Sequence, residues 1–164
     1  MKVAIYGGTF DPLHSAHKEI IKRLSGMFDK VFVVPTTVRY YKKNDCMFSF
    51  NYRFEEVLKF VNSSNLENVD VLDIEREVSN DWRFIDTLNA VIFELKLELY
   101  VDAEVFVAMG SDSFSQFTTW TSYKEILDKS KLVVFHRPGH EMESFPAEVP
   151  ADRYIYVEGL DMDI

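Results

Sequence analysis

Cysteine is almost absent from this 164-residue sequence, which contains Cys46 alone. A single thiol excludes an internal disulfide and a cysteine-based metal site. Long hydrophobic runs are missing too, because no stretch reaches the roughly 18 apolar residues that cross a bilayer. Residues 1–6 are too short to be the apolar region of a signal peptide. We therefore expect a cytoplasmic protein without a membrane partner.

Positive charge is scarce as well. The chain has 18 lysines and arginines against 27 aspartates and glutamates, for a formal net charge of −9. Such a surface repels nucleic-acid phosphates, and no basic stripe offsets the repulsion. The acidic residues are scattered, Glu75 among them, which is typical of a solvated surface. A small anion can still bind where a few positive groups converge in one cleft.

Hydrophobic residues make up 47% of the chain and aromatic residues 15%, which is enough for the core of one domain spanning residues 1–164. Short apolar runs predict strands at 3–6, 30–34, 69–74, 104–109, 132–135 and 154–157. Helical spacing predicts helices at 15–28, 50–61 and 85–99, and two short helices within 111–129. This alternation predicts an α/β fold, a Rossmann-like doubly wound and mostly parallel sheet with helices on both faces. The segments that follow the strands should share the edge at which such sheets bind ligands.

The segment between the first predicted strand and helix carries the strongest functional signal. Residues 7–17 read GGTFDPLHSAH. The glycines allow a tight turn and a close approach of the backbone to a ligand. The start of the next helix offers free N–H groups and the positive end of a dipole. His14 and His17 are three residues apart, so both project from one face of that first turn. A lone histidine is usually structural, but this combination suits the binding of a polyphosphate.

This segment resembles the GGTFDP-x-H-x-G-H signature of the nucleotidylyltransferase superfamily, and the chain looks like the bacterial nicotinate-mononucleotide adenylyltransferases. The similarity covers nearly all of the chain, and residues 7–17 and 109–120 are its most specific parts. The further matches follow in the family's order: Val34-Pro35-Thr36 with Lys42, Arg53, Asp86-Thr87-Leu88, MGSDSF at 109–114 with Thr119-Trp120, and HRPG at 136–139.

The resemblance implies an enzyme that transfers AMP from ATP to nicotinate or nicotinamide mononucleotide and releases pyrophosphate, a step of NAD biosynthesis. It implies that Mg²⁺ binds mainly through the ATP phosphates, without dedicated protein ligands. His14 and His17 would be the catalytic residues, holding the phosphates and stabilising charge as the bond to pyrophosphate breaks. The resemblance assigns ATP binding to Gly7, Gly8, Thr9, Phe10, Lys42, Gly110, Asp112 and Arg137, and binding of the pyridine mononucleotide to Phe84, Thr87 and Trp120.

Four of these residues have ordinary structural roles as alternatives. Asp112 is equally suited to cap a helix, and Trp120 to fill the core. Lys42 and Arg137 can be surface cations.

The chain departs from the family pattern at three places before its end. Ala16 replaces the glycine before the second histidine, and residues 37–43 lack the family's prolines. Trp82-Arg83-Phe84 replaces Ser-Tyr-Thr at a turn whose backbone amides face the nicotinate carboxylate in the family. The preference for the acid or the amide is therefore open, and Arg83 either binds a carboxylate or faces solvent.

The family's I-S-S/A-T-x-I-R motif and its helix would follow residue 164, so we expect either a piece of a longer protein or the loss of part of the ATP site. The alternative enzymes are another nucleotidyltransferase such as phosphopantetheine adenylyltransferase, which usually has Thr in place of His14, and a cytidylyltransferase. A nucleotide-binding module with impaired catalysis is the alternative from a different functional class.

Overall fold

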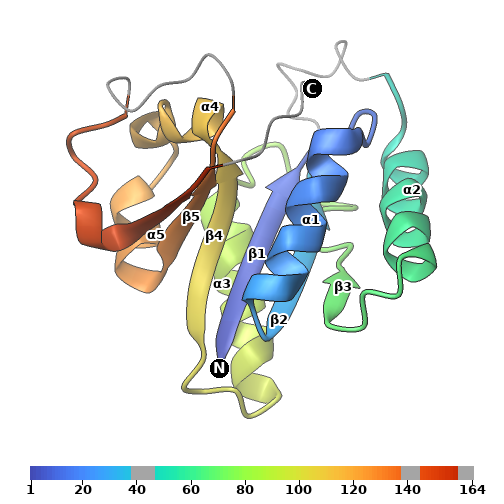
Figure 1. The fold of residues 1–164 in the computed structure, drawn as a ribbon, viewed down its shortest axis with the longest axis horizontal. Coiled ribbons are helices and arrows are strands. Elements are labelled where there is room, and N and C mark those ends of the chain that lie inside the picture. The colour runs from blue at the N-terminus through green and yellow to red at the C-terminus, as the bar shows by residue number, and fades with distance from the viewer. Residues whose placement is uncertain (38–46, 138–144, 159–164) are drawn as a thin grey trace.

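A computed structural model, which describes residues 1–37, 47–137 and 145–158, contains one six-stranded sheet (Figure 1). Its strand order is β3-β2-β1-β4-β5-β6, and each neighbouring pair runs parallel. This order is that of a doubly wound Rossmann-like fold, which confirms the predicted fold class. The strands are β1 (Lys2–Gly8), β2 (Lys30–Pro35), β3 (Val69–Val71), β4 (Glu104–Gly110), β5 (Lys131–Phe135) and β6 (Tyr154–Val157).

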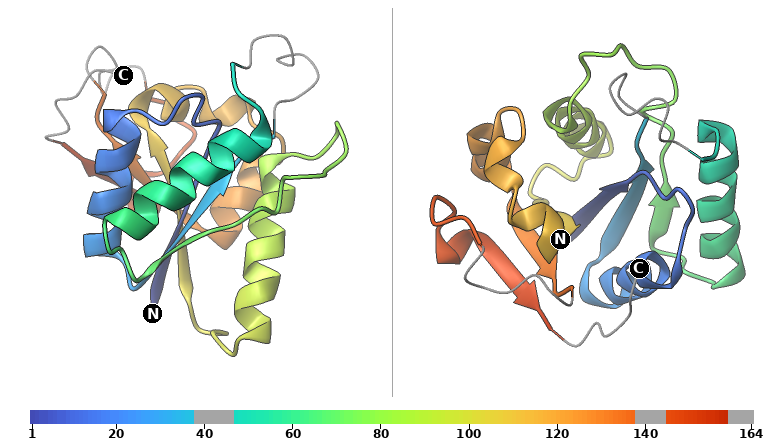
Figure 2. Two further views of the ribbon diagram at one scale, coloured as in Figure 1. Left: turned by 90° about the vertical axis from the view of Figure 1, so that its right-hand side faces the viewer. Right: turned by 90° about the horizontal axis from the view of Figure 1, so that it is seen from above.

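Helices cover both faces of the sheet (Figure 2). Successive side chains of a strand point to opposite faces. In β1, Val3 and Ile5 therefore pack with the helices that begin at Phe84, Ser111 and Tyr123, whereas Ala4 and Tyr6 pack with the helices that begin at Ser15 and Phe50. Both faces of β1 are buried, as expected for a central parallel strand. The helices are α1 (Ser15–Met27), α2 (Phe50–Ser63), α3 (Phe84–Leu97), α4 (Ser111–Phe114) and α5 (Tyr123–Lys129), with the 3₁₀ helices η2 (Phe117–Thr119) and η4 (Ala151–Arg153).

Several element boundaries differ from the predicted ones by one to three residues. The strand predicted at 69–74 ends at Val71, because a turn follows in which the N–H of Arg76 donates to the carbonyl of Asp73. β1 continues to Gly8, which pairs with Pro35 of β2. The helix predicted at 85–99 begins at Phe84 and ends at Leu97, and Leu99 adopts a φ of 68° just beyond it.

The chain reverses its winding direction between β1 and β4. The connection from β1 to β2 passes through α1 on one face, and the connection from β4 to β5 passes through α4 and α5 on the other. Such a switch point leaves a crevice at the carboxyl ends of the two strands, which is the usual ligand site of open α/β sheets.

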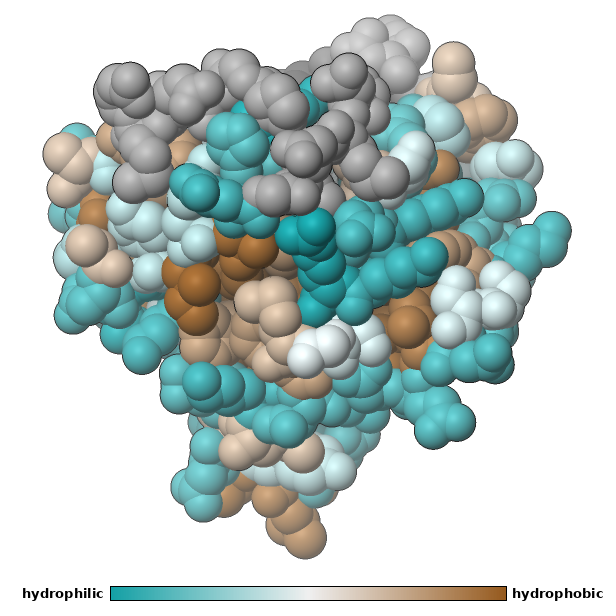
Figure 3. Space-filling model, viewed as in Figure 1, coloured by the Kyte–Doolittle hydropathy of each residue, from teal (hydrophilic) through white to brown (hydrophobic). Residues whose placement is uncertain are grey.

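Exposed hydrophobic side chains occur at the opposite end of the molecule. Leu97, Leu99 and Val101 are exposed where α3 leads to β4, at the lower end of Figure 1, and Figure 3 shows hydrophobic side chains both at its lower end and in the middle of the face, among hydrophilic ones. In the described part of the chain, no helix combines the length and the apolar character that a membrane span requires.

Candidate active site

A cleft of about 720 Å³ opens at the carboxyl ends of β1 and β4. Its walls come from the loop after β1, the first turn of α1, the turn before α3, the β4–α4 junction, the segment around η2 and the end of β5. Residues far apart in the sequence therefore converge here, as the switch-point rule predicts. Of the predicted site residues, Gly7, Gly8, Thr9, His17, Phe84, Gly110, Asp112, Trp120 and Arg137 line the cleft.

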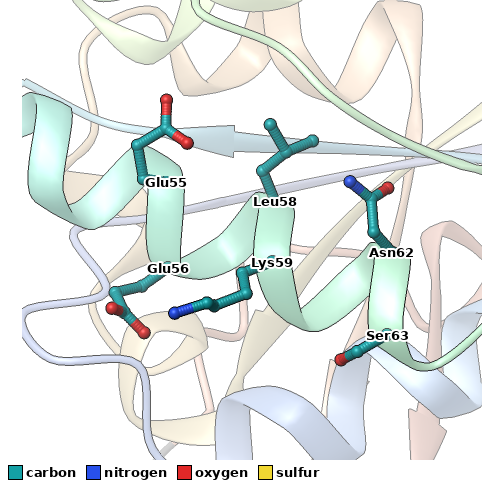
Figure 4. A pocket seen from close by; sticks show the side chains of 6 residues that line it. All are labelled: Glu55, Glu56, Leu58, Lys59, Asn62 and Ser63. Atoms are coloured by element: carbon teal, nitrogen blue, oxygen red, sulfur yellow. The ribbon is translucent and has the colours of Figure 1, made fainter.

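A second hollow of about 580 Å³ lies along α2 (Figure 4). In this view, Glu55, Leu58 and Asn62 project from one side of the helix and Glu56, Lys59 and Ser63 from the other. All six belong to one helix, so this hollow lacks the groups from several elements that a ligand site usually gathers. The cleft at the switch point is the candidate active site.

Phe10 fixes the glycine loop. Its backbone adopts a φ of 49°, and its side chain is 1% exposed. The ring packs edge-on against Tyr6, at a centroid distance of 5.4 Å, and against His17, at 5.1 Å. A Cβ on Gly8 would lie 2.9 Å from two carbons of the Phe10 ring. Glycine at position 8 is thus required by the packing of Phe10 behind the loop, which holds its backbone at the cleft wall.

The two histidines lie together at the start of α1. Their rings stack with centroids 4.3 Å apart and planes 15° apart. The backbone N–H of His14 donates to Nδ1 of His17 over 3.2 Å. Neutral His17 must therefore carry its proton on Nε2, so that atom is the donor it can offer. Nδ1 of His14 is buried and has no hydrogen-bond partner among the described residues. Since buried polar atoms are rarely unpaired, this arrangement suits completion by a ligand or water.

Burial keeps His17 neutral in the free protein. Burial, and after it the charges of His14 and Arg137, together lower the pKa of His17 to about 4, against an opposing effect of Asp112. At neutral pH the ring is therefore a hydrogen-bond donor without net charge. A polyphosphate beside it would oppose this shift, because a nearby negative charge favours the protonated form.

Asp112 and Arg137 form an ion pair on the β4–β5 side of the cleft. Nη1 of Arg137 lies 2.5 Å from Oδ2 of Asp112. The backbone N–H of Arg137 donates to the hydroxyl of Ser111 over 2.8 Å, and Ser111 is buried. A Cβ on Gly110 would meet Oδ1 of Asp112 at 2.6 Å. The pair thus fixes an arginine at the cleft wall, and Gly110 provides the space for its carboxylate partner.

An aromatic wall faces β1. Phe84, the first residue of α3, lies 5.5 Å from Trp120 by ring centroids, and Trp120 packs on the buried Phe117 at 5.2 Å. A Cβ on Gly7 would be 3.4 Å from the Phe84 ring. Phe84 and Trp120 both line the cleft while resting on the core, so the two alternatives considered for Trp120 are compatible.

Thr87 lies behind this wall and is not among the residues that line the cleft. Its hydroxyl accepts from Nε1 of Trp82 over 2.8 Å and donates to Oε2 of Glu75 over 2.6 Å. Oε1 of Glu75 accepts the N–H of Thr37. The expectation that Glu75 belongs to the solvated surface is wrong, since it is fully buried. These bonds, which compensate its burial, tie the turn before α3 to the segment after β2.

Arg53 organises the other side of the cleft, although the sequence indicated only that it matches a family position. Its side chain is 2% exposed. Nη1 donates to the carbonyls of Thr9, at 2.7 Å, and Thr36, at 2.8 Å, and Nε donates to that of Phe48 at 3.2 Å. The segment after β1, the segment after β2 and the segment before α2 are thereby held together. Lys42, predicted to contact phosphate, lies outside the described residues.

Comparison with known proteins gives concordant results. Residues 5–158 match the family model described as cytidylyltransferase-like. A "Probable nicotinate-nucleotide adenylyltransferase" of Helicobacter pylori strain HPAG1 is 32% identical over 165 residues, which covers 99% of this chain and 87% of that protein. A protein of the same name from Fusobacterium nucleatum subsp. nucleatum is 34% identical over 142 residues, covering 84% of this chain and 68% of that protein. The solved structure of Plasmodium falciparum nicotinic acid mononucleotide adenylyltransferase complexed with NaAD matches this chain with a TM-score of 0.75 and 18% sequence identity. The match covers 99% of this chain and 77% of that chain, and it shows the shared fold.

Proposed function

This chain belongs to the cytidylyltransferase-like family, and we propose that it is a nicotinate-nucleotide adenylyltransferase that transfers AMP from ATP to a pyridine mononucleotide and releases pyrophosphate. The product is the dinucleotide precursor of NAD, and the reaction belongs in the cytoplasm. The observation that carries the proposal is the stacked pair of His14 and His17 at the glycine-lined start of α1, where His17 lines the cleft of the switch point and His14 packs against it.

The reaction is an in-line displacement. An oxygen of the mononucleotide phosphate forms a bond to the α-phosphorus of ATP while the bond from that phosphorus to the bridging oxygen of pyrophosphate breaks. The attacking phosphate is already anionic, so it needs no general base, and no covalent enzyme intermediate forms. Catalysis then consists of positioning and of stabilising the charge that develops on the transferred and leaving groups.

The triphosphate binds at the start of α1. The backbone of Gly7, Gly8, Thr9 and Phe10 approaches it, and the first N–H groups of α1 point toward it. The Nε2–H of His17 donates to a phosphate oxygen, and His14 acts beside it on the same anion. These donors remain in place throughout the reaction and stabilise the departing pyrophosphate.

The remaining predicted contacts follow from the walls of the cleft. Arg137, oriented by Asp112, binds phosphate, and Gly110 and Asp112 line the nucleotide site. From the resemblance alone, Lys42 would add a further cation. The pyridine ring stacks on the wall formed by Phe84 and Trp120. Thr87 supports that wall through Trp82 instead of touching the ligand.

The described residues fit a Mg²⁺ ion that is held chiefly by the substrate. Among them, no three His, Cys, Asp or Glu side chains gather in a way that could hold a metal ion. Mg²⁺ keeps several water ligands and is commonly held through substrate phosphates with few protein ligands. When bound to the ATP oxygens, it would neutralise part of their charge.

The decisive experiment incubates the protein with ATP, Mg²⁺ and each pyridine mononucleotide, and measures pyrophosphate release and dinucleotide formation. We expect turnover with a pyridine mononucleotide and none with phosphopantetheine. His17→Ala should lower kcat by roughly 10²- to 10³-fold, because one preorganised donor to developing charge is lost. The circular dichroism spectrum should be unchanged.

Lys18→Ala is the matched control, because Lys18 is the next residue of α1 and is exposed to solvent. It should turn over at the wild-type rate. Binding of ATP without any pyrophosphate release, or full activity of His17→Ala, would contradict the proposal.

A further inference from the structure

The part of the cleft beside the aromatic wall contains an arginine that the proposed reaction has not yet used. Arg83 precedes Phe84 at the N-terminal end of α3, and both residues line the cleft. Phe84 in turn lies against Trp120. A ring stacked on this wall would have its substituents close to the start of α3, where Arg83 lies.

The Arg83 side chain is held in place without being neutralised by a bound carboxylate. Its Nη1 donates to the carbonyls of Asn80, at 2.8 Å, and Trp82, at 2.9 Å. These bonds occupy one of the guanidinium nitrogens. Within residues 1–37, 47–137 and 145–158, no carboxylate forms an ion pair with Arg83, so Nε and Nη2 keep donors for a ligand.

Two acidic residues near Arg83 are engaged elsewhere. Oδ2 of Asp86 accepts the backbone N–H of Arg83 over 2.8 Å and so caps the start of α3. Asp81 is fully exposed, and its pKa is lowered first by a hydrogen bond from Ser79, with a smaller effect of the Arg83 charge. Solvent screens such an exposed pair, so the positive charge of Arg83 remains available at the cleft wall.

A guanidinium in this position distinguishes a carboxylate from a carboxamide. Two of its parallel N–H groups match the two oxygens of a carboxylate, whereas a carboxamide presents one oxygen and an NH₂ group that is itself a donor. The partial positive charge at the start of α3 acts in the same direction. From this geometry we infer that Arg83 is a specificity-determining residue, which binds the carboxylate of the pyridine ring and selects the nicotinate mononucleotide over its amide.

This inference rests on the proposed function, and it is tested by the ratio of kcat/KM for nicotinate mononucleotide to kcat/KM for nicotinamide mononucleotide. We expect the wild-type protein to prefer the acid. Arg83→Gln should reduce the ratio by roughly 10- to 100-fold, because a charge-assisted pair is lost with the acid alone. Arg83→Lys keeps the charge without the paired donors, so its ratio should lie between that of the wild type and that of Arg83→Gln.

The ratio separates specificity from a structural role. Arg83 also holds the turn before α3 through Asn80 and Trp82, and loss of that support would slow both substrates alike. Arg76→Gln is the matched control, because it removes an arginine outside the cleft and should leave the ratio unchanged.

Each remaining outcome identifies which idea fails. Equal losses with the acid and the amide, or an unchanged ratio in Arg83→Gln, would overturn the assignment of Arg83 while the proposed function stands. A wild-type protein that uses neither mononucleotide would overturn the proposed function and this inference together.

Discussion

Replacement of Gly8 by alanine tests how the glycine loop is built. The new Cβ would lie 2.9 Å from two carbons of the Phe10 ring, whereas ordinary contacts begin at 3.4 Å, so the atoms must separate by about 0.5 Å. The Phe10 side chain is 1% exposed and contacts the ring of His17, so it has little room to yield. Overpacking of this kind costs about 1–3 kcal/mol of stability.

The displacement should also reach His17, for which we propose a catalytic role. Phe10 lies between Gly8 and His17, so moving its ring shifts either the loop backbone or the imidazole. Misplacement by about 1 Å can cost 10²-fold in rate, and half of that displacement should lower kcat/KM by roughly tenfold. The assay combines urea unfolding, which gives the free energy of unfolding, with pyrophosphate release at subsaturating ATP.

Gly26→Ala is the matched control. A Cβ at Gly26 would have no neighbour within 4 Å, and the residue lies near the end of α1, where alanine favours the helix. This variant should gain up to about 1 kcal/mol of stability and keep its kinetics. The packing argument is refuted if Gly8→Ala is as stable and as active as the wild type, and its link to His17 is refuted if only stability falls.

Three further predictions address other parts of the site. Arg53→Met should lower the free energy of unfolding by about 3 kcal/mol in urea titrations, because buried carbonyls lose a charged donor. The control Arg23→Met removes a partly exposed ion pair and should lower the free energy of unfolding by about 1 kcal/mol or less. Asp112→Asn should raise the KM for ATP roughly tenfold in steady-state assays, because Arg137 loses its charged partner. The pKa of His17 is about 4 in the folded protein and 6.5 in the unfolded chain. Between pH 6.5 and pH 4 the unfolded chain therefore binds a proton that the folded protein does not, so the free energy of unfolding falls as the pH falls. The loss should total about 3 kcal/mol, and His17→Asn should show a flatter dependence in urea titrations from pH 4 to pH 7.

The fold was predictable because its signals are local. In β1, both faces are buried, so a continuous apolar run marks the strand. In α1, Ile20, Ile21 and Leu24 recur with helical spacing and face the sheet. Boundaries were less accurate where tertiary contacts decide them. The last residues of the strand predicted at 69–74 leave the sheet, and Leu72 and Ile74 instead pack against the core on the α3 side.

The residues of the candidate site were likewise predictable where the signal is local in the sequence, and not where distant contacts define the residue's role. The glycines and the pair of His14 and His17 lie within one short segment, so the sequence alone indicated that they belong together. Glu75 and Arg53 could not be assigned in this manner. Their partners other than Phe48 lie 12 to 44 residues away along the chain, and only the packed structure shows that both charges are buried. The available signal was the position of Glu75 directly after a predicted strand and, for Arg53, the match to a family position.

The site reconciles a polyanionic substrate with a chain of net charge −9 by concentrating its donors at one edge of the sheet. Surface charges separated by more than about 10 Å are largely screened in physiological salt, so the scattered acidic residues oppose binding weakly. Burial keeps His17 neutral in the free protein. A neutral donor avoids the cost of holding a buried charge in the free protein. In the proposed reaction it serves the leaving pyrophosphate through its Nε2–H without taking up a second proton, because Nδ1 already accepts the N–H of His14.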